Sequence, residues 1–312
     1  MRLFLCGLVA VLAGLGTAAI GLLYLALPSL GSVFAARGLP APDPRAAVSG
    51  GLTYLLAGTA LGWTGVAAMR GRSWSRPVLV SLAWIWLVTG ALFAALLALL
   101  LPSLREADPS GLALPQAIWF TVRAVVLGLA IGCGIAVPAL VLWWLRFPAT
   151  HPSVSRTDLR LDWSERCPQP VLVLAIALAA TAVLALPTLA RPVVPVLAVV
   201  LTGWPAAIAT LAFAGVSAWL ARSVYRLERR GLLATAAATA ICGVALVGTI
   251  LTVDSSELGE ALGVSSADWA WLESSVPIGR PTAALVAVGA TLASLAWLAT
   301  LRRHFFPPGA GD

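Results

Sequence analysis

The chain has 312 residues, 60% of them hydrophobic and only 11% charged, with a formal net charge of +7. Since soluble domains carry about 25% charged residues, this composition excludes an ordinary soluble protein and indicates one that lies in a membrane. All 20 basic residues are arginine, which suggests a GC-rich bacterial genome, and we expect no nucleic-acid partner because membrane topology accounts for the basic charge.

Eight apolar runs carry the excess hydrophobicity, and each is long enough for a helix of roughly 20 residues that crosses the hydrocarbon core of a bilayer. The first run is longer than the apolar core of a signal peptide, which has about 7–15 residues, so we expect it to remain as a membrane helix. The sequence therefore predicts an all-α integral membrane protein with eight transmembrane helices, at Leu3–Leu27, Ala47–Met69, Val78–Leu101, Thr121–Leu145, Val171–Ala190, Leu197–Ala221, Gly231–Val253 and Pro281–Leu301.

The density of arginine alternates between successive loops. If the N-terminus is cytoplasmic, the cytoplasmic segments hold 14 of the 20 arginines, and the outer segments hold more acids than arginines. This is the positive-inside bias of multi-pass membrane proteins. We therefore expect a bacterial inner (plasma) membrane protein, embedded in the lipid bilayer, with both termini in the cytoplasm.

Two stretches in the two halves of the chain are nearly identical. YLALPSL begins at Tyr24, and VLALPTL begins at Val183. An ordered series of further matches indicates an internal duplication, which is common in transporter folds. The offset between matched residues changes only in the loops, and the series pairs Gly62 with Gly215, Arg72 with Arg226, Arg76 with Arg230, Arg123 with Arg280 and Gly132 with Gly289.

Each half has four predicted spans, so both halves enter the membrane from the same side. We expect two parallel four-helix repeats related by a pseudo-twofold axis along the membrane normal. The predicted units are a first transmembrane repeat at 1–148, a polar cytoplasmic linker at 149–169 and a second transmembrane repeat at 170–312.

Two polar segments allow more than one interpretation. Within the linker, Asp158–Pro168 is either a short helix on the membrane surface or an irregular connection. The outer loop 254–280 carries five acids and the helix-start patterns DSSE and SSAD, which predict two short surface helices with Trp269 and Trp271 at the interface. This loop is either a docking surface for a protein partner or a solvated loop.

The predicted spans lack the groups on which most membrane-embedded chemistry depends. Their interiors contain no Asp, Glu, Lys or His, although proton-coupled transporters usually keep such a group in the membrane. The two histidines, His151 and His304, lie in cytoplasmic segments, so no pair of imidazoles is available for haem or a metal. The four cysteines are expected to be small packing residues. We expect no enzyme activity, no cofactor and no metal site.

The second and sixth spans contain helix-weakening residues at matching positions. Two adjacent glycines weaken the second, and a proline in the sixth removes a backbone donor. Interrupted helices at equivalent places in two repeats point to a ligand-binding site, and the alternative is a kink inherited from the ancestor. The candidate ligand-binding residues are Ser49, Gly50, Gly51, Thr202, Gly203, Trp204 and Pro205.

Other matched residues lie in the fourth and eighth spans. Arg123 and Arg280 are near the outer ends of these spans, where they either snorkel to the interface or contact an anion or a lipid headgroup. Gly128, Gly132 and Ala136 follow one another at four-residue spacing, and we expect this small-residue face to pack within the bundle.

The segment Leu27–Pro42, LPSLGSVFAARGLPAP, resembles a short stretch of the F-family inner-membrane proteins of type II secretion. Those proteins have large cytoplasmic helical domains, which this chain lacks, so no function is assigned from the resemblance. Two hypotheses follow from the residues themselves. The first is a non-catalytic membrane subunit or scaffold, which the absence of buried charge favours. The second is a permease for a neutral or anionic small solute, with its site between the two repeats.

Overall fold

The structure is a computed structural model, and it describes residues 1–36, 43–100, 116–146, 167–197, 199–261 and 279–306. The regular secondary structure of these residues is helical apart from one two-stranded hairpin, and short turns connect the elements. The first half contains α1 (Arg2–Ala26), η1 (Leu27–Leu30), α2 (Gly31–Ala36), α3 (Pro44–Met69), α4 (Ser75–Leu100), α5 (Gln116–Ile131), η3 (Gly132–Ala136) and α6 (Val137–Arg146). The second half contains α7 (Gln169–Ala185), η4 (Pro187–Ala190), β1 (Val193–Val196), β2 (Val199–Thr202), α8 (Gly203–Tyr225), α9 (Arg229–Thr252), α10 (Ser255–Ala261) and α12 (Arg280–Phe305).

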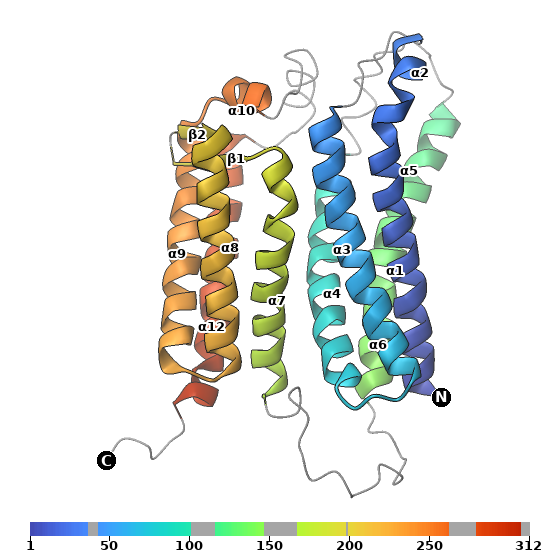
Figure 1. Ribbon diagram of the computed structural model, residues 1–312, viewed down its shortest axis with the longest axis vertical. Coiled ribbons are helices and arrows are strands. Elements are labelled where there is room, and N and C mark those ends of the chain that lie inside the picture. The colour runs from blue at the N-terminus through green and yellow to red at the C-terminus, as the bar shows by residue number, and fades with distance from the viewer. Residues whose placement is uncertain (37–42, 101–115, 147–166, 198, 262–278, 307–312) are drawn as a thin grey trace, which may run out of the picture.

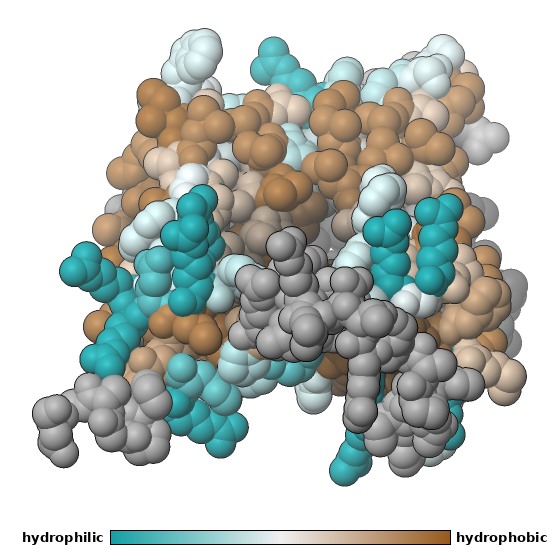
Figure 2. All heavy atoms as spheres, turned by 60° about the horizontal axis from the view of Figure 1, so that its bottom comes forward, coloured by the Kyte–Doolittle hydropathy of each residue, from teal (hydrophilic) through white to brown (hydrophobic). Residues whose placement is uncertain are grey.

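The prediction of eight apolar helices is confirmed, because 8 helices among the described residues are long and apolar enough to cross a membrane. The start of α1 and the end of α12 lie at the same end of the molecule, which we call the terminal end (Figure 1). Figure 2 brings this end forward and shows hydrophilic side chains gathered there, with an apolar belt beyond them. The described arginines of the terminal end are Arg2, Arg70, Arg72, Arg76, Arg146, Arg222, Arg226, Arg229, Arg230, Arg302 and Arg303.

Each half is a bundle of four membrane helices in the same up-and-down order. In the first half α1 packs on α3, α3 on α4, α4 on the α5–η3–α6 segment, and α6 on α1. In the second half α7 packs on α8, α8 on α9, α9 on α12, and α12 on α7. Because α1 and α7 both start at the terminal end, the two bundles have the same orientation in the membrane (Figure 1).

Glycines at seven-residue spacing hold α1 and α3 together, and this pair is the most extensively packed in the molecule. A Cβ atom added at Gly14 would lie 2.6 Å from the carbonyl oxygen of Gly58, and one added at Gly7 would lie 2.7 Å from that of Gly65. The third pair is Gly21 with Gly51, at 2.8 Å. Small residues of this kind drive helix association in lipid by allowing backbones to approach closely.

The equivalent pair of helices in the second half uses small residues other than glycine. Ala175 and Ala182 of α7 are buried and seven residues apart, as are Thr210 and Ser217 of α8. The spacing of seven keeps each pair on one helical face, since two turns of helix take about seven residues. Small residues thus recur at seven-residue spacing in the first two membrane helices of both bundles, as glycines in the first and as alanine, threonine and serine in the second.

A cysteine lies in a buried cluster near the terminal end of each bundle. Cys6 packs with Ala68 of α3, Leu79 and Ala83 of α4, and residues of α6. Cys167, just before α7, packs with Val224 of α8, Leu232 of α9 and residues of α12. Each cluster thus joins all four membrane helices of its bundle. The prediction that all four cysteines are packing residues is confirmed for these two, whereas Cys133 and Cys242 are exposed.

The fourth membrane segment is not a regular α-helix. Residues Gly132–Ala136 form a π-helical turn between α5 and α6. Pro138 supplies no N–H for the carbonyl of Gly134 four residues earlier, which favours an irregular turn here. A Cβ added at Gly90 of α4 would lie 2.1 Å from the carbonyl oxygen of Gly134, so this turn contacts α4 through glycine backbones. Gly128, Gly132 and Gly289 have no atoms within contact range of an added Cβ, so the expected packing of that face is wrong.

A β-hairpin replaces the predicted start of the sixth span. We predicted a helix from Leu197, but the chain forms β1 and β2, paired antiparallel from Val193 with Thr202 to Val196 with Val199. The helix α8 begins only at Gly203. The segment is apolar enough to pass as a membrane helix, yet its run of valines favours a strand.

The two bundles meet along α4 and α7, and η4 packs against α3. In the predicted alignment the counterpart of α7 is α1, so the contact joins non-equivalent helices. A twofold axis would place equivalent surfaces on both sides of an interface. The main contact between the bundles therefore does not have the pseudo-twofold form that we expected.

Candidate functional site

The predicted helix break in the second span is absent. α3 is continuous from Pro44 to Met69, and the hydroxyl of Thr53 donates to the carbonyl of Ser49 at 2.8 Å, as in an ordinary helix. A Cβ added at Gly50 would lie 3.2 Å from the ring of Tyr24, and one added at Gly51 would lie 2.6 Å from Cγ of Leu25. These two glycines allow close packing of α3 on α1.

The matching residues of the sixth span lie where the hairpin meets α8. Thr202 is the last residue of β2 and the N-cap of α8, and Gly203 follows with a φ of 64°. Pro205 lies in the first turn of α8, where its missing N–H leaves no helical hydrogen bond unmade, so it causes no kink. Trp204 is 83% exposed. The two predicted breaks therefore do not form a matched pair of interrupted helices.

The structure describes the side chain of only one of the two matched arginines. Arg123 lies in α5, but its side chain is outside the described part of the chain. Arg280 is the first residue of α12, and its Nη2 lies 3.7 Å from Oδ1 of Asp254. That ion pair is exposed, and Asp254 also accepts a hydrogen bond from the backbone N–H of Ser256 at the start of α10. One of the two predicted loop helices is thus present as α10, and the position of the other lies outside the described residues.

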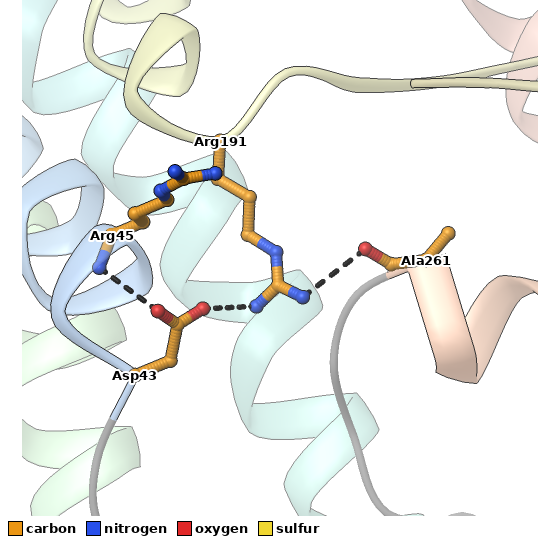
Figure 3. A network of polar contacts seen from close by, with 4 residues as sticks. All are labelled: Asp43, Arg45, Arg191 and Ala261. Carbon is orange, nitrogen blue, oxygen red and sulfur yellow. Dashed lines mark hydrogen bonds and ion pairs between the residues drawn. The ribbon is translucent and has the colours of Figure 1, made fainter. Parts of the chain in front are cut away.

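A polar network joins the two bundles at the end of the molecule opposite the terminal end (Figure 3). Asp43 is the N-cap of α3, where its Oδ1 accepts a hydrogen bond from the backbone N–H of Arg45 at 3.0 Å. Its Oδ2 forms an ion pair with Nη1 of Arg191, which follows η4 in the second bundle. Arg191 also donates from Nη2 to the carbonyl of Ala261, at the end of α10, at 3.2 Å. We call this set the outer clamp.

A second polar contact joins the bundles toward the terminal end. Gln169, the first residue of α7, donates from Nε2 to the carbonyl oxygen of Pro77 at 2.9 Å and lies 3.0 Å from the hydroxyl oxygen of Ser81. Pro77 and Ser81 belong to α4, and Ser81 is fully buried. We call this set the inner clamp. The two clamps therefore bind α7 to the first bundle near both of its ends.

A groove of about 540 Å³ lies between α4 and α6. None of the predicted ligand-binding residues lines it. Its lining residues are Val80, Trp84, Leu87, Ala139, Leu142, Trp143, Leu145 and Arg146.

The described residues offer no metal centre, since they contain no group of three or more His, Cys, Asp or Glu side chains that could hold an ion. The four cysteines are free thiols. Burial raises the pKa of the Cys167 thiol from its ordinary value of 9.0 to about 11, so this thiol is neutral near pH 7. A neutral, buried thiol is a poor nucleophile and a poor metal ligand.

Sequence reasoning missed three features of this arrangement. The glycines at 7, 14 and 21 and those at 51, 58 and 65 recur at intervals of seven, a signal that was readable from the sequence. The outer clamp gave no such signal, because nothing in a single sequence pairs Asp43 with Arg191. The inner clamp depends on the side-by-side placement of α4 and α7, which only the fold reveals.

The chain matches no family model, no curated protein and no solved structure.

Proposed function

We propose that this protein is a non-catalytic subunit or scaffold of a bacterial inner membrane, built from two parallel four-helix repeats. The observation that carries the proposal is the glycine contact between α1 and α3. Gly51, one of the predicted ligand-binding residues, lies against the backbone of Gly21, where an added Cβ would be 2.9 Å from the carbonyl oxygen. Gly51 therefore packs inside the first bundle, whereas a permease of the predicted type needs this residue to face a cavity between the two repeats.

Several local structures support the duplication. Pro28 and Pro187 each lie in a short 3-10 turn after the first membrane helix of their half. Cys6 and Cys167 lie in comparable buried clusters. The first of these similarities was expected from the sequence, and the second was not.

The turn after the second membrane helix of each half also supports the duplication, but it changes the alignment of the two halves by two residues. In the first half the backbone N–H groups of residues 70, 71 and 72 bond to the carbonyls of 66, 68 and 67. In the second half those of 226, 227 and 228 bond to 222, 224 and 223, in the same pattern. Gly71 and Leu227 both have positive φ, of 69° and 58°. This geometry is that of a Schellman turn, and it pairs Arg70 with Arg226, whereas the sequence comparison paired Arg72 with Arg226.

The distribution of arginine supports the proposed topology. Near the opposite end the arginines whose side chains the structure describes are Arg45, Arg191 and Arg280, of which the last two form ion pairs with acids. The richer terminal end is cytoplasmic if the positive-inside bias holds. Reporter fusions at residues 152 and 312 should then both give cytoplasmic signals, and a periplasmic signal at either would contradict this orientation.

A flux experiment separates the scaffold from the permease. The purified protein is reconstituted into liposomes, and the flux of a panel of small neutral and anionic solutes is compared with that of protein-free liposomes. We expect equal rates. A cysteine-free variant that carries D43C and R191C, cross-linked across the outer clamp, is the control for movement between the bundles. Saturable flux that cross-linking abolishes would overturn the scaffold proposal and favour the permease.

A further inference from the structure

The groove between α4 and α6 is open at the surface of the protein, and it is lined by residues of two membrane helices. Its α4 wall is formed by Val80, Trp84 and Leu87, which share one face of the helix through spacings of four and three residues. The facing wall comes from α6. Trp84 and Trp143 line the groove from the two helices and are 47% and 56% exposed. The fourth membrane segment, which includes α6, is the least buried of the eight, with 11% of its most apolar stretch inside the protein.

Arginines at the ends of membrane helices mark the membrane interface, so a groove that begins at Arg146 extends from that interface into the apolar part of α6. Ala139 and Arg146, at its two ends on α6, are seven residues apart, which corresponds to about 10 Å along a helix axis. The hydrocarbon core of a bilayer is about 30 Å thick, so the groove covers roughly two thirds of one leaflet. This depth suits the glycerol backbone and the upper part of an acyl chain.

Positive charge is concentrated at the shallow end of the groove. Arg146 is the last residue of α6 and is exposed, and it lines the groove. Arg76, near the start of α4, donates from Nη2 to the carbonyl oxygen of Leu145 at 2.9 Å. A second guanidinium therefore lies at the same end, and the lining residues that the structure describes include no carboxylate. Guanidinium groups bind phosphate well because their N–H donors match its oxygen atoms.

We propose that this groove binds one anionic phospholipid of the leaflet at the terminal end. The lipid phosphate lies at Arg146, and one acyl chain follows the apolar walls between Trp84 and Trp143. Basic pockets between transmembrane helices bind anionic headgroups in this way. Trp143, three residues before Arg146, lies near the level of the headgroups, where tryptophan is favoured. The rest of the groove is apolar, which fits an acyl chain and not a water-soluble solute.

Native mass spectrometry of the delipidated full-length protein in detergent tests the proposal. Phosphatidylglycerol is titrated against phosphatidylcholine of the same acyl chains, and the first bound lipid is counted. We expect the protein to prefer the anionic lipid. R146Q should weaken phosphatidylglycerol binding about fivefold and leave phosphatidylcholine nearly unchanged, since one arginine near the headgroups contributes about that factor.

Two further variants make the result specific to the groove. A139F fills the deep end from an exposed position, so it should abolish the first lipid without disturbing the fold, which circular dichroism verifies. R303Q removes an exposed arginine from the last turn of α12, the corresponding place in the second bundle, and should not change the lipid preference. Equal loss in R303Q and R146Q would show only general charge attraction. That result, or an unchanged preference in both R146Q and A139F, would overturn the proposal.

Discussion

The first two membrane helices pack against each other in both bundles, but their small residues differ. α1 and α3 meet through three pairs of glycines, whose backbones touch at Gly14 and Gly58. α7 and α8 bury alanine, threonine and serine at the same spacing and pack less extensively. Glycine lowers helix stability by about 1 kcal/mol relative to alanine in water. In the first bundle the closer contact between α1 and α3 compensates for this lower helix propensity. The comparison shows that the seven-residue spacing is shared, whereas the closeness of approach depends on the residue.

The largest expected effect comes from G14L, which disrupts the contact between α1 and α3, the closer of the two helix pairs. An added side chain meets the carbonyl of Gly58 and the N–H of Gly62, both at 2.6 Å and both backbone atoms that cannot rotate away. Overpacking of this kind costs about 3 kcal/mol or more, so we expect little folded protein in the membrane. Abundance and thermal stability in detergent provide the measurement. G16L is the matched control, because a Cβ at Gly16 meets nothing within 4 Å. Equal abundance of the two variants would contradict the glycine contact.

A smaller effect is expected from D43A, which removes a contact between the bundles. The substitution deletes the N-cap of α3 and the ion pair with Arg191, for a loss of about 1–2 kcal/mol in the free energy of unfolding. D43N retains a capping oxygen and should lose less. D254A is the comparison within one bundle, where the ion pair with Arg280 is exposed, and its effect on the melting temperature should be smaller. If D254A destabilises more than D43A, the outer clamp does not hold the bundles together.

The buried cysteine of the second bundle should make stability depend on pH. Its pKa is 9.0 ordinarily and about 11 in the folded protein, so the folded state holds this proton more tightly than the unfolded state. Stability is therefore complete below pH 9 and falls as the pH rises from 9 to 11, by about 1 kcal/mol at pH 10. The measurement is the melting temperature of C167A relative to the unmodified protein from pH 8 to 10.5. An identical slope for both proteins would show that Cys167 does not contribute.

The smallest expected effect comes from G71A in the turn after α3. Gly71 has a φ of 69° and open space around it, so alanine there meets backbone strain alone. We expect a loss of about 1 kcal/mol in stability. Leu227 adopts the same conformation in the second bundle, where it packs against the buried cluster around Cys167. L227A should therefore also destabilise, through lost packing. A neutral G71A would mean that the turn does not need glycine.

Much of the fold followed from the sequence because long apolar runs and arginine-rich loops are local signals. Hydropathy does not predict the start of α8, because it does not separate a valine-rich strand from a membrane helix. A proline predicts a kink only beyond the first turn of a helix, and Pro205 lies in the first turn of α8. The candidate site was harder to predict. Gly50 and Gly51 were interpreted as helix breakers, but in lipid a glycine serves equally as a surface for close approach. The outer clamp joins residues far apart in the chain, and no local pattern encodes such a pair.

The two clamps have a consequence for the order of assembly during synthesis. Their first-bundle partners, Asp43, Pro77 and Ser81, are all made before α7 leaves the ribosome, and domains generally fold from the N-terminus as they are made. Gln169 emerges at the start of α7 and Arg191 just after η4. The incoming helix thus meets a surface that is already complete, and it is secured first at the terminal end and then at the opposite one. The remaining helices of the second bundle can then assemble around a helix whose position is already fixed.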